Sequence, residues 1–546
     1  MSDIILGTRT LEGRDAISPL FAHLRPDLGV TIDASQLRVL RLVGSPGEGK
    51  TRALRDYFEQ LVALGWGGIL LDPKGELAEL AIRCTRFPER TICISPGMTP
   101  RRWSLNPLEI DPRHPHHEEI KAIVLGNTVA TFAHIGRFDA QTMTNIRTYL
   151  NASVLLAQSR PQPTLIDALL ILTRKDFRDR LLDREGDDYQ RLFWANYEDL
   201  TEYMRQNQTI STLNRLWEMT QQAVVRGWIA PYHSTIRLLE WLNAGKIIIV
   251  NLGKRLHRSE GQYLGNLLMA TIINGYRRRA DGLLQDDTGR PWVVCADEFH
   301  TLAPAPFDEI ITQGRSASVI PLIAHQDDSQ LRAIEEIANA VSHAVVDLSL
   351  YRSKEDLISL ERSEQNREKV AAIRKLRRFQ GHLTMRTDAG TEELVIDLPA
   401  DSAIPSDGQL AMGLWQQEDP AFTRDPADVP TLDAWLDGLP LVMQPPPRKS
   451  RPPAQTTPSG TKENDGPATT TPQTAAQTAT QGAETDRSTT ATGQATGGRA
   501  AGDRGAVSPG YLRRANGGTI VPPPVLRPGE QTSPPPRTRG RKPRGE

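Results

Sequence analysis

The chain has 546 residues, which is too long for one small domain and allows a large hydrophobic core. Hydrophobic residues make up 38% and charged residues 24%, which is ordinary for a cytosolic protein and too polar for a membrane protein. Because 65 Lys and Arg balance 66 Asp and Glu, the net charge of -1 carries no information about binding partners. Any basic surface that binds nucleic acid must therefore be a local patch.

Cysteine usage and the distribution of apolar runs indicate a cytoplasmic protein. Cys84, Cys93 and Cys295 form no Cys-x-x-Cys pair and are too few for a disulfide framework, so we expect reduced thiols. The chain starts with acidic residues and lacks a basic stretch followed by an apolar one, so no secretory signal is expected. The most apolar runs, residues 165–172 and 247–252, are well short of the roughly 20 residues that span a bilayer, so no membrane insertion is expected.

Two sections of the chain carry the pattern of buried strands. Residues 1–112 contain apolar runs interrupted by glycine and proline, such as LRVLRLVG and GGILLD. In residues 241–442 the pattern returns in KIIIVNL, WVVCAD, VIPLIAHQ and HAVVDLSL, with segments of helical length between them. Strands that alternate with helices predict an α/β domain with a mostly parallel sheet.

Residues 113–240 lack such strands and show helical spacing instead. Leu165, Leu169 and Leu172 lie three or four residues apart, as does the set that begins at Leu213 and continues with Leu216 and Thr220. The pattern predicts an all-helical domain inserted between the two strand-containing sections.

The composition changes again near Met443. Pro, Thr, Gln, Ala and Gly then dominate and large apolar residues nearly vanish, so residues 443–546 are predicted to be disordered. The last stretch, residues 537–544 (RTRGRKPR), is densely basic and lies beside prolines. Either a solubilising tail, or an arm that binds nucleic acid or docks on a partner, fits this pattern.

A phosphate-binding loop is predicted between an apolar strand and an amphipathic helix. The loop consists of Gly44, Ser45, Pro46, Gly47, Glu48, Gly49, Lys50 and Thr51. Its glycines let backbone amides approach the phosphates, and the helix start contributes a favourable dipole. We expect Lys50 to neutralise the β- and γ-phosphates of ATP and the Thr51 hydroxyl to bind Mg²⁺. The buried face of the helix should comprise Leu54, Phe58, Leu61 and Val62.

A second catalytic element is predicted in WVVCADEFHTL, where an apolar run ends in two acidic residues. Asp297 would hold the magnesium shell, directly or through water, and Glu298 would orient and deprotonate the attacking water. An apolar run before Asp-Glu is a weak signal alone and a strong one beside a phosphate loop. The adjacent glutamate argues against a small-molecule kinase, whose acceptor is a substrate hydroxyl.

Two further polar residues are candidates for the same site. Gln326 ends the strand VIPLIAHQ, where it could sense the γ-phosphate, and a hydrogen-bonded amide at a strand end is the alternative. Arg315 lies eleven residues earlier and could reach a phosphate across a subunit boundary, or be a surface arginine. Asp72, Lys74 and Glu76 would either line the nucleotide cleft or cap a turn. The histidines at 114, 116 and 117 lack a paired ligand motif, which favours solvated side chains over a metal site.

Taken in order, these motifs resemble the soluble parts of type IV secretion coupling proteins (TraG/TraD-like) of the HerA/FtsK superfamily. The resemblance covers residues 15–440 and rests on the phosphate loop, LLDPKGE, NPLE, STLNRLWEM, KIIIVNLGK, ADEF, GRSASVIPLIAHQDDSQL and IANAVSHAVVDLSLYRSKEDL. It implies a RecA-like P-loop ATPase domain, formed by residues 1–112 and 241–442, with the all-helical domain inserted. It also implies a hexameric ring that hydrolyses ATP to translocate DNA through its channel.

The resemblance implies a role for each matching residue. Lys50 and Thr51 would be the nucleotide-loop residues, and Asp297 and Glu298 the acidic pair. Gln326 would be the sensor, and the matching arginine, Arg315, would be a finger that acts on the neighbouring subunit.

The sequence departs from the family in one respect, because conjugative coupling proteins usually begin with transmembrane helices. Either a partner recruits this chain to the inner face of the membrane, or it is a soluble relative with another role. The implied partners are DNA, further copies in a homo-hexamer, and relaxase or secretion-channel proteins. Three functions stay open: a DNA-translocating motor, a HerA-like helicase that works with a nuclease, and a nucleotide-controlled docking protein that recruits transfer substrates without pumping.

Overall fold

The computed structural model describes residues 3–9, 29–98, 103–133, 140–285, 287–302, 306–331, 335–342, 344–361, 366–387 and 390–398. The predicted disordered tail, residues 443–546, lies outside the described residues. Within the described chain, Cys84, Cys93 and Cys295 are buried and none is in a disulfide. None of the helices in these ranges combines the length and apolar character needed to cross a bilayer.

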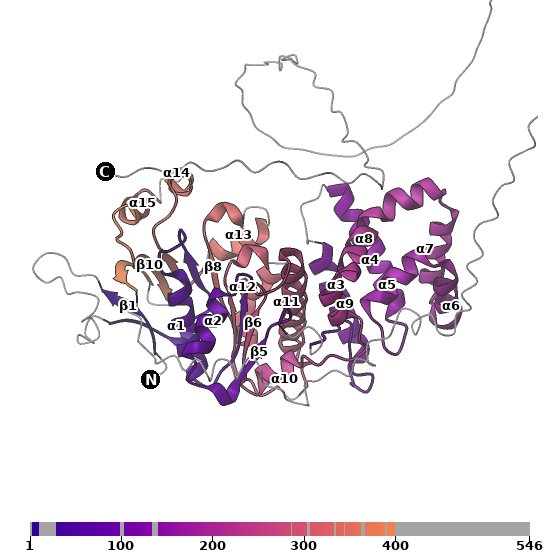
Figure 1. Ribbon diagram of the computed structural model, residues 1–546, viewed down its shortest axis with the longest axis horizontal. Coiled ribbons are helices and arrows are strands. Elements are labelled where there is room, and N and C mark those ends of the chain that lie inside the picture. Colours follow the sequence, from indigo (N-terminus) through magenta and orange to yellow (C-terminus); the bar gives the residue numbers. More distant parts are fainter. Residues whose placement is uncertain are drawn as a thin grey trace, which may run out of the picture. The chain divides into compact units, whose positions relative to one another are not determined.

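The described strands form one sheet of eleven strands, in the order β2-β1-β11-β10-β9-β3-β8-β7-β4-β6-β5 (Figure 1). Their bounds are β1 Asp3–Arg9, β2 Gly29–Asp33, β3 Leu40–Val43, β4 Gly67–Asp72, β5 Thr91–Ile94, β6 Ile247–Asn251, β7 Trp292–Ala296, β8 Val319–His325, β9 Val346–Ser349, β10 Gln380–Thr387 and β11 Gly390–Asp397. The seven strands from β9 to β5 pair in parallel, which confirms the predicted mostly parallel α/β fold. The antiparallel flank of β10, β11, β1 and β2 was not predicted.

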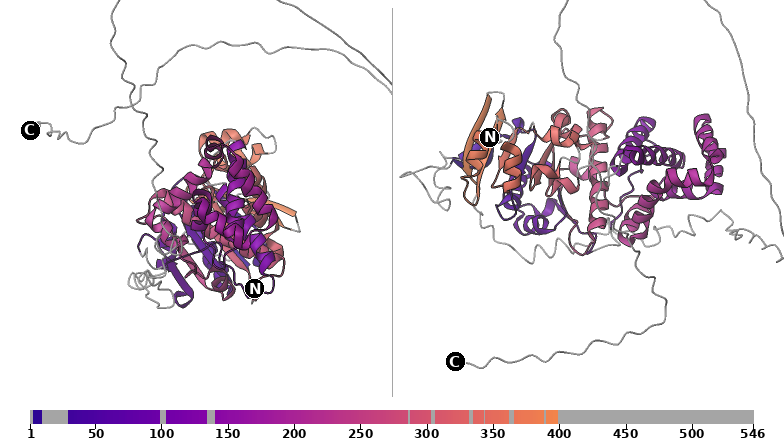
Figure 2. Two further views of the ribbon diagram at one scale, coloured as in Figure 1. Left: turned by 90° about the vertical axis from the view of Figure 1, so that its right-hand side faces the viewer. Right: turned by 90° about the horizontal axis from the view of Figure 1, so that it is seen from above.

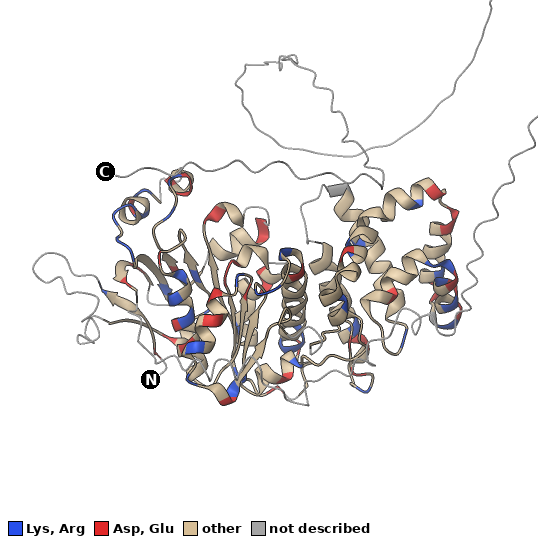
Figure 3. Cartoon of the chain, viewed as in Figure 1, with Lys and Arg blue, Asp and Glu red and all other residues tan. Residues whose placement is uncertain are grey.

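Some of the described helices cover the two faces of this sheet, and the others pack against those helices. Their bounds are α1 Lys50–Ala63, α2 Glu76–Cys84, α3 His117–Ala133, α4 Ala140–Ala157, α5 Leu165–Thr173, α6 Lys175–Glu185, α7 Asp188–Asp199, α8 Glu202–Gln221, α9 Ala223–Ile229, α10 Leu238–Asn243, α11 Arg258–Ala280, α12 Phe307–Gln313, α13 Glu335–Ser342, α14 Lys354–Glu361 and α15 Arg367–Ile373. Lys and Arg are interspersed with Asp and Glu along them (Figure 3).

Alternation along each parallel strand divides the core into two layers. Ile69 and Leu71 of β4 join the cluster that includes α11, whereas Leu70 joins the cluster that includes α1 and α2. Successive strand side chains point to opposite faces, so a strand covered on both sides is apolar throughout. The predicted face of α1, with Phe58 at its centre, is buried in the second of these clusters.

The segment from α3 to α9 contains helices and no strand among its described residues. Leu165, Leu169 and Leu172 are buried in α5, as their spacing predicted. In the view from above, α11 stands between the strands and these helices, and α3 packs against it (Figure 2). The pattern agrees with an inserted helical domain, although its bounds of 113 and 240 stay a prediction.

A buried network of charges joins β3, β8, β9 and α14 beside the carboxyl edge of the sheet. The side chain of Arg352 is 1% exposed and donates to Asp328 at 2.9 Å and to Asp356 at 3.1 Å. Burial alone would raise the pKa of Asp328, but the charges of Arg41 and Arg352 hold that pKa well below its usual range. Each buried charge therefore has an opposite charge within reach, which a buried ion requires.

Replacing Arg352 by methionine should lower the free energy of unfolding by about 3 to 5 kcal/mol, because two carboxylates lose their buried partner. The matched control is Arg374→Met, since Arg374 pairs with Glu361 at 2.7 Å but the two side chains are 47% and 40% exposed. That exposed pair should contribute less than about 1 kcal/mol. Urea denaturation of both variants makes the comparison, and equal losses would contradict the role assigned to the network.

Candidate nucleotide-binding site

The predicted phosphate loop lies between the end of β3 and the start of α1. Its backbone needs glycine at Gly47 and Gly49, whose φ angles of 85° and 101° are in the left-handed region. The Ser45 amide donates to the carbonyl of Tyr351 at 2.8 Å, which attaches the loop to the chain that follows β9. The Lys50 ammonium donates to the loop carbonyls of Gly44 and, at 3.0 Å, of Ser45.

The three strands that follow β3 on one side of the sheet bring further polar side chains to the same edge. In the order β3-β8-β7-β4, these strands are followed by Gln326, by Asp297 and Glu298, and by Lys74. Parallel strands have their carboxyl ends at one edge, which is where ligands bind in open α/β sheets. Gln326 therefore follows the strand that pairs directly with the phosphate-loop strand, as predicted.

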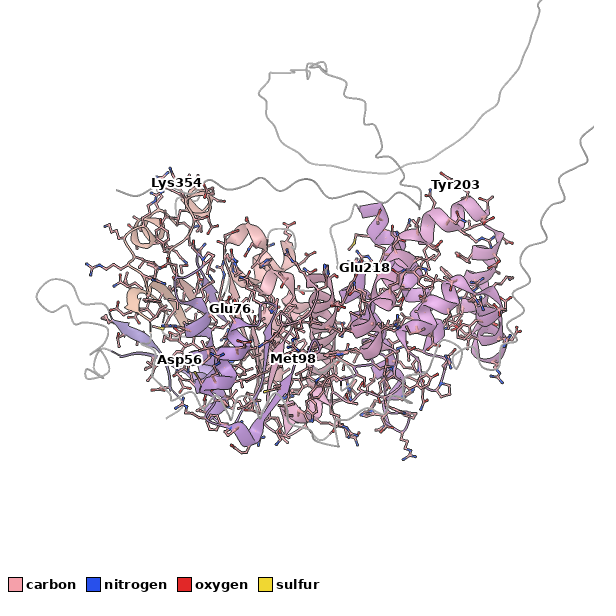
Figure 4. The ribbon with its side chains drawn as sticks, in the orientation of Figure 1. Asp56, Glu76, Met98, Tyr203, Glu218 and Lys354 are labelled. Atoms are coloured by element: carbon pink, nitrogen blue, oxygen red, sulfur yellow. The ribbon has the colours of Figure 1, made fainter. Side chains whose placement is uncertain are left out.

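A cavity of about 290 Å³ joins these elements. Its lining residues are Pro46, Gly47, Gly49, Lys50, Thr51, Arg52, Lys74, Glu76, Asp297, Glu298, Gln326, Arg378 and Phe379. The loop and the acidic pair, about 250 residues apart in the sequence, thus face one space. Figure 4 marks Glu76 at the start of α2, the helix that enters the cavity wall after β4.

Burial and neighbouring carboxylates make Asp297 a poor place for an uncompensated negative charge. Asp297 is 5% exposed, and burial, Asp72 and Glu298 raise its pKa to about 6. A divalent cation bound here would stabilise the ionised carboxylate. The described residues contain no group of three or more His, Cys, Asp and Glu that could hold a metal ion. Mg²⁺ usually takes most of its ligands from phosphate and water, so Asp297 and Thr51, which both line the cavity, would be enough to hold it.

Glu298 is held in one position by its backbone and by its neighbours. Its φ of 46° is left-handed, which is uncommon for a residue other than glycine and is found at functional sites. Its carboxylate accepts hydrogen bonds from Lys74 and, at 2.9 Å, from Gln326. Burial acts to raise the pKa of Glu298, but these two partners lower it overall. The carboxylate is therefore ionised at neutral pH, although its bonds to Lys74 and Gln326 make it a weaker base than a free glutamate.

Of residues 72–76, one caps a turn and two line the cavity. Asp72 accepts hydrogen bonds from the amides of Lys74 at 2.8 Å and Ala78 at 2.9 Å, so it caps the turn into α2. Lys74 and Glu76 line the cavity instead. In the histidine cluster, His114 is buried and not solvated, and its ring accepts a hydrogen bond from the His116 amide at 3.1 Å, whereas the His116 side chain is exposed.

Arg315 lies away from this cavity. It is exposed in the short turn Gly314–Ala317 that precedes β8, whereas Gln326 directly follows β8. Seven residues of strand span roughly 20 Å, so Arg315 is at the opposite edge of the sheet from the site of its own chain. Its action on a neighbouring subunit stays a prediction.

Arg378 and Phe379 are cavity residues that the motifs did not indicate. They come more than 300 residues after the loop in sequence, directly before β10. The only local signal is a basic run with an aromatic residue, KLRRFQ, next to a strand, and this pattern occurs on many surfaces. Their position depends on the antiparallel pairing of β10 with β9, which the sequence pattern did not predict.

The fold of this chain is similar to that of a solved coupling protein, although sequence comparisons find no match. No protein-family model matches the chain, and no curated protein matches it in sequence. Among solved structures, the plasmid coupling protein TrwB in complex with the non-hydrolysable ATP analogue ADPNP superposes with a TM-score of 0.51 and 16% identity, over 72% of this chain and 94% of TrwB. VirB4 of Thermoanaerobacter pseudethanolicus gives a TM-score of 0.45 and 14% identity, over 73% and 96%. The superposition on TrwB shows that the chain has the fold of a conjugative coupling protein, which confirms the resemblance at the level of fold.

Proposed function

We propose that this protein is an ATP-driven motor that translocates DNA, of the coupling-protein type. The observation that carries the proposal is the shared cavity, where Lys50 and Thr51 of the loop meet Asp297, Glu298 and Gln326. A loop that binds phosphates, a buried carboxylate for a cation and an ionised glutamate are the parts that nucleotide hydrolysis needs. The ADPNP bound to TrwB supports ATP as the nucleotide.

In this proposal the loop amides and the Lys50 ammonium bind the phosphate oxygens. Lys50 is 7% exposed, and burial lowers its pKa although Asp297 and Glu298 act to raise it. A buried ammonium gains strongly from a negative partner, because little water screens the pair. Lys50 would therefore exchange the carbonyls of Gly44 and Ser45 for phosphate oxygens.

Hydrolysis would depend on the residues around Glu298. Its carboxylate would orient a water molecule and take a proton from it as the water attacks the γ-phosphate, while the bond from the γ-phosphorus to the bridging oxygen breaks and ADP leaves. Lys74 keeps the carboxylate ionised, and Gln326 fixes its direction and contacts the same phosphate. Thr51 and Asp297 would hold Mg²⁺, which would supply positive charge to offset the charge that develops on the phosphates.

The proposed substrate and assembly come from the resemblance to the coupling proteins. DNA would pass along a homo-hexameric ring in which Arg315 of each subunit completes the site of its neighbour. Relaxase or secretion-channel proteins would be further partners, one of which recruits the motor to the inner face of the membrane. A docking protein would turn over ATP without regard to DNA, whereas a motor should be stimulated by it.

Two substitutions separate nucleotide binding from hydrolysis. Lys50→Ala should weaken ATP binding about a hundredfold, or ~3 kcal/mol, because a buried charge contact with phosphate is lost. Glu298→Gln should keep the affinity and lower turnover by about 10² to 10⁴, because the general base is lost. Calorimetry and phosphate release measure the two effects. Lys354→Ala, at an exposed lysine of α14, and Glu202→Gln, at an exposed glutamate of α8, are the matched controls. Unchanged affinity in Lys50→Ala would refute the loop assignment.

Arg315→Ala tests the ring. The variant should bind ATP almost normally and hydrolyse it about 10³- to 10⁵-fold more slowly, as when an arginine finger is removed. Mixing it with Glu298→Gln creates some interfaces with a wild-type Glu298 opposite a wild-type Arg315, and these should restore turnover once energy transfer between labelled subunits has shown exchange. Arg237→Ala, at a 65% exposed arginine, is the control. Wild-type turnover by Arg315→Ala would make Arg315 an ordinary surface residue.

A further inference from the structure

The proposed hydrolysis assigns no role to one wall of the cavity. Arg378 and Phe379 line it together with the loop. They precede β10, whereas the acidic pair and Gln326 follow β7 and β8. We propose that the ring of Phe379 is the surface on which the base of the bound nucleotide stacks, with Arg378 holding that ring against the loop. This inference rests on the proposed binding of ATP and adds how the nucleoside is recognised.

The topology places Phe379 on the correct side of the loop for this role. In the order β10-β9-β3-β8-β7, the strand that Phe379 precedes lies two strands from β3 on one side, and the strand before Glu298 lies two strands from β3 on the other. Strand β10 is antiparallel to β9, so its first residue lies at the same edge as the loop. A triphosphate that reaches Glu298 with its last phosphate therefore extends its nucleoside toward Phe379.

Phe379 is fixed in an unfavourable conformation that keeps its ring at the cavity. Its φ of 65° is left-handed, which is rare for a bulky side chain and requires support from its surroundings. Its carbonyl accepts a hydrogen bond from the Leu398 amide at 2.9 Å, which attaches it to the end of β11. The residue is still 39% exposed, although the ring is apolar. Burying the remaining face against a flat base would remove apolar surface from water.

The ring of Phe379 also packs closely against the phosphate loop. A Cβ atom at Gly49 would lie 2.9 Å from the ring of Phe379, so glycine at this position allows the ring to rest on the loop. The Arg378 guanidinium lies 4.9 Å from the centre of the same ring, and its Nε donates to the carbonyl of Gly47 at 3.3 Å. A cation over one part of an aromatic ring stabilises its position. The ring and the loop therefore form one continuous wall.

The test compares ATP with inorganic tripolyphosphate, which carries the phosphates without a base. Both are titrated by calorimetry, with Mg²⁺, into the full-length protein and into Phe379→Ala and Phe379→Trp. Base stacking on an aromatic side chain is lost on substitution by alanine, so ATP should bind about tenfold more weakly to Phe379→Ala while tripolyphosphate binds as before. Phe379→Trp, which keeps a flat ring, should restore ATP binding.

A matched variant and the second ligand separate the possible failures. Tyr189→Ala removes an aromatic side chain that is 85% exposed on α7, and should leave both affinities unchanged. Equal weakening of ATP and tripolyphosphate in Phe379→Ala would show that the ring only supports the loop, and unchanged ATP affinity would show that it does not touch the base. Either result overturns the inference while the proposed function stands. A wild-type protein that binds neither ligand would overturn the proposed function itself.

Discussion

The pairing of β3 with parallel neighbours is the constraint on which the site depends. Because β3, β8, β7 and β4 run in one direction, the residues that follow them meet at one edge. Short segments that are far apart in sequence thereby become the walls of one cavity. A loop at the end of any one strand could bind phosphate, but it would lack the acidic residues that hydrolysis needs and that the neighbouring strands contribute.

This arrangement places negatively charged side chains in a buried site, and positively charged side chains lie close to them. Asp72 and Asp297 lie buried on the acidic side, and burial raises the pKa of both. Lys50 and Lys74 face them, and Glu298 keeps a left-handed backbone beside them. Such conformations are stabilised only by a rigid surrounding structure. The core on both sheet faces, together with the ion network of Arg352, provides that rigidity.

The sequence predicts the parts whose chemistry is local. The glycines before Lys50 and the acidic residues after an apolar strand have a meaning within a few residues, and the structure places them together. Phe379, Arg378 and the partnership of Lys74 with Glu298 depend on contacts between distant segments, which spacing cannot reveal. The antiparallel flank also escaped prediction, because β10 contains polar residues although it is mostly buried, and β11 is polar and half exposed, unlike the uniformly apolar central strands. The roles of the site residues, Arg315 and Gln326 included, and the bounds of the domains stay predictions.

The central claim is that one cavity both binds the nucleotide and hydrolyses it. A crystal structure of the protein with Mg²⁺, ADP and aluminium fluoride, which imitates the transferring phosphoryl group, tests that claim most directly. The account predicts the phosphates in the loop at Lys50, the metal between Thr51 and Asp297, and the attacking water in contact with Glu298. A nucleotide bound elsewhere, or one bound in the loop with Glu298 out of reach of the attacking water, would contradict it.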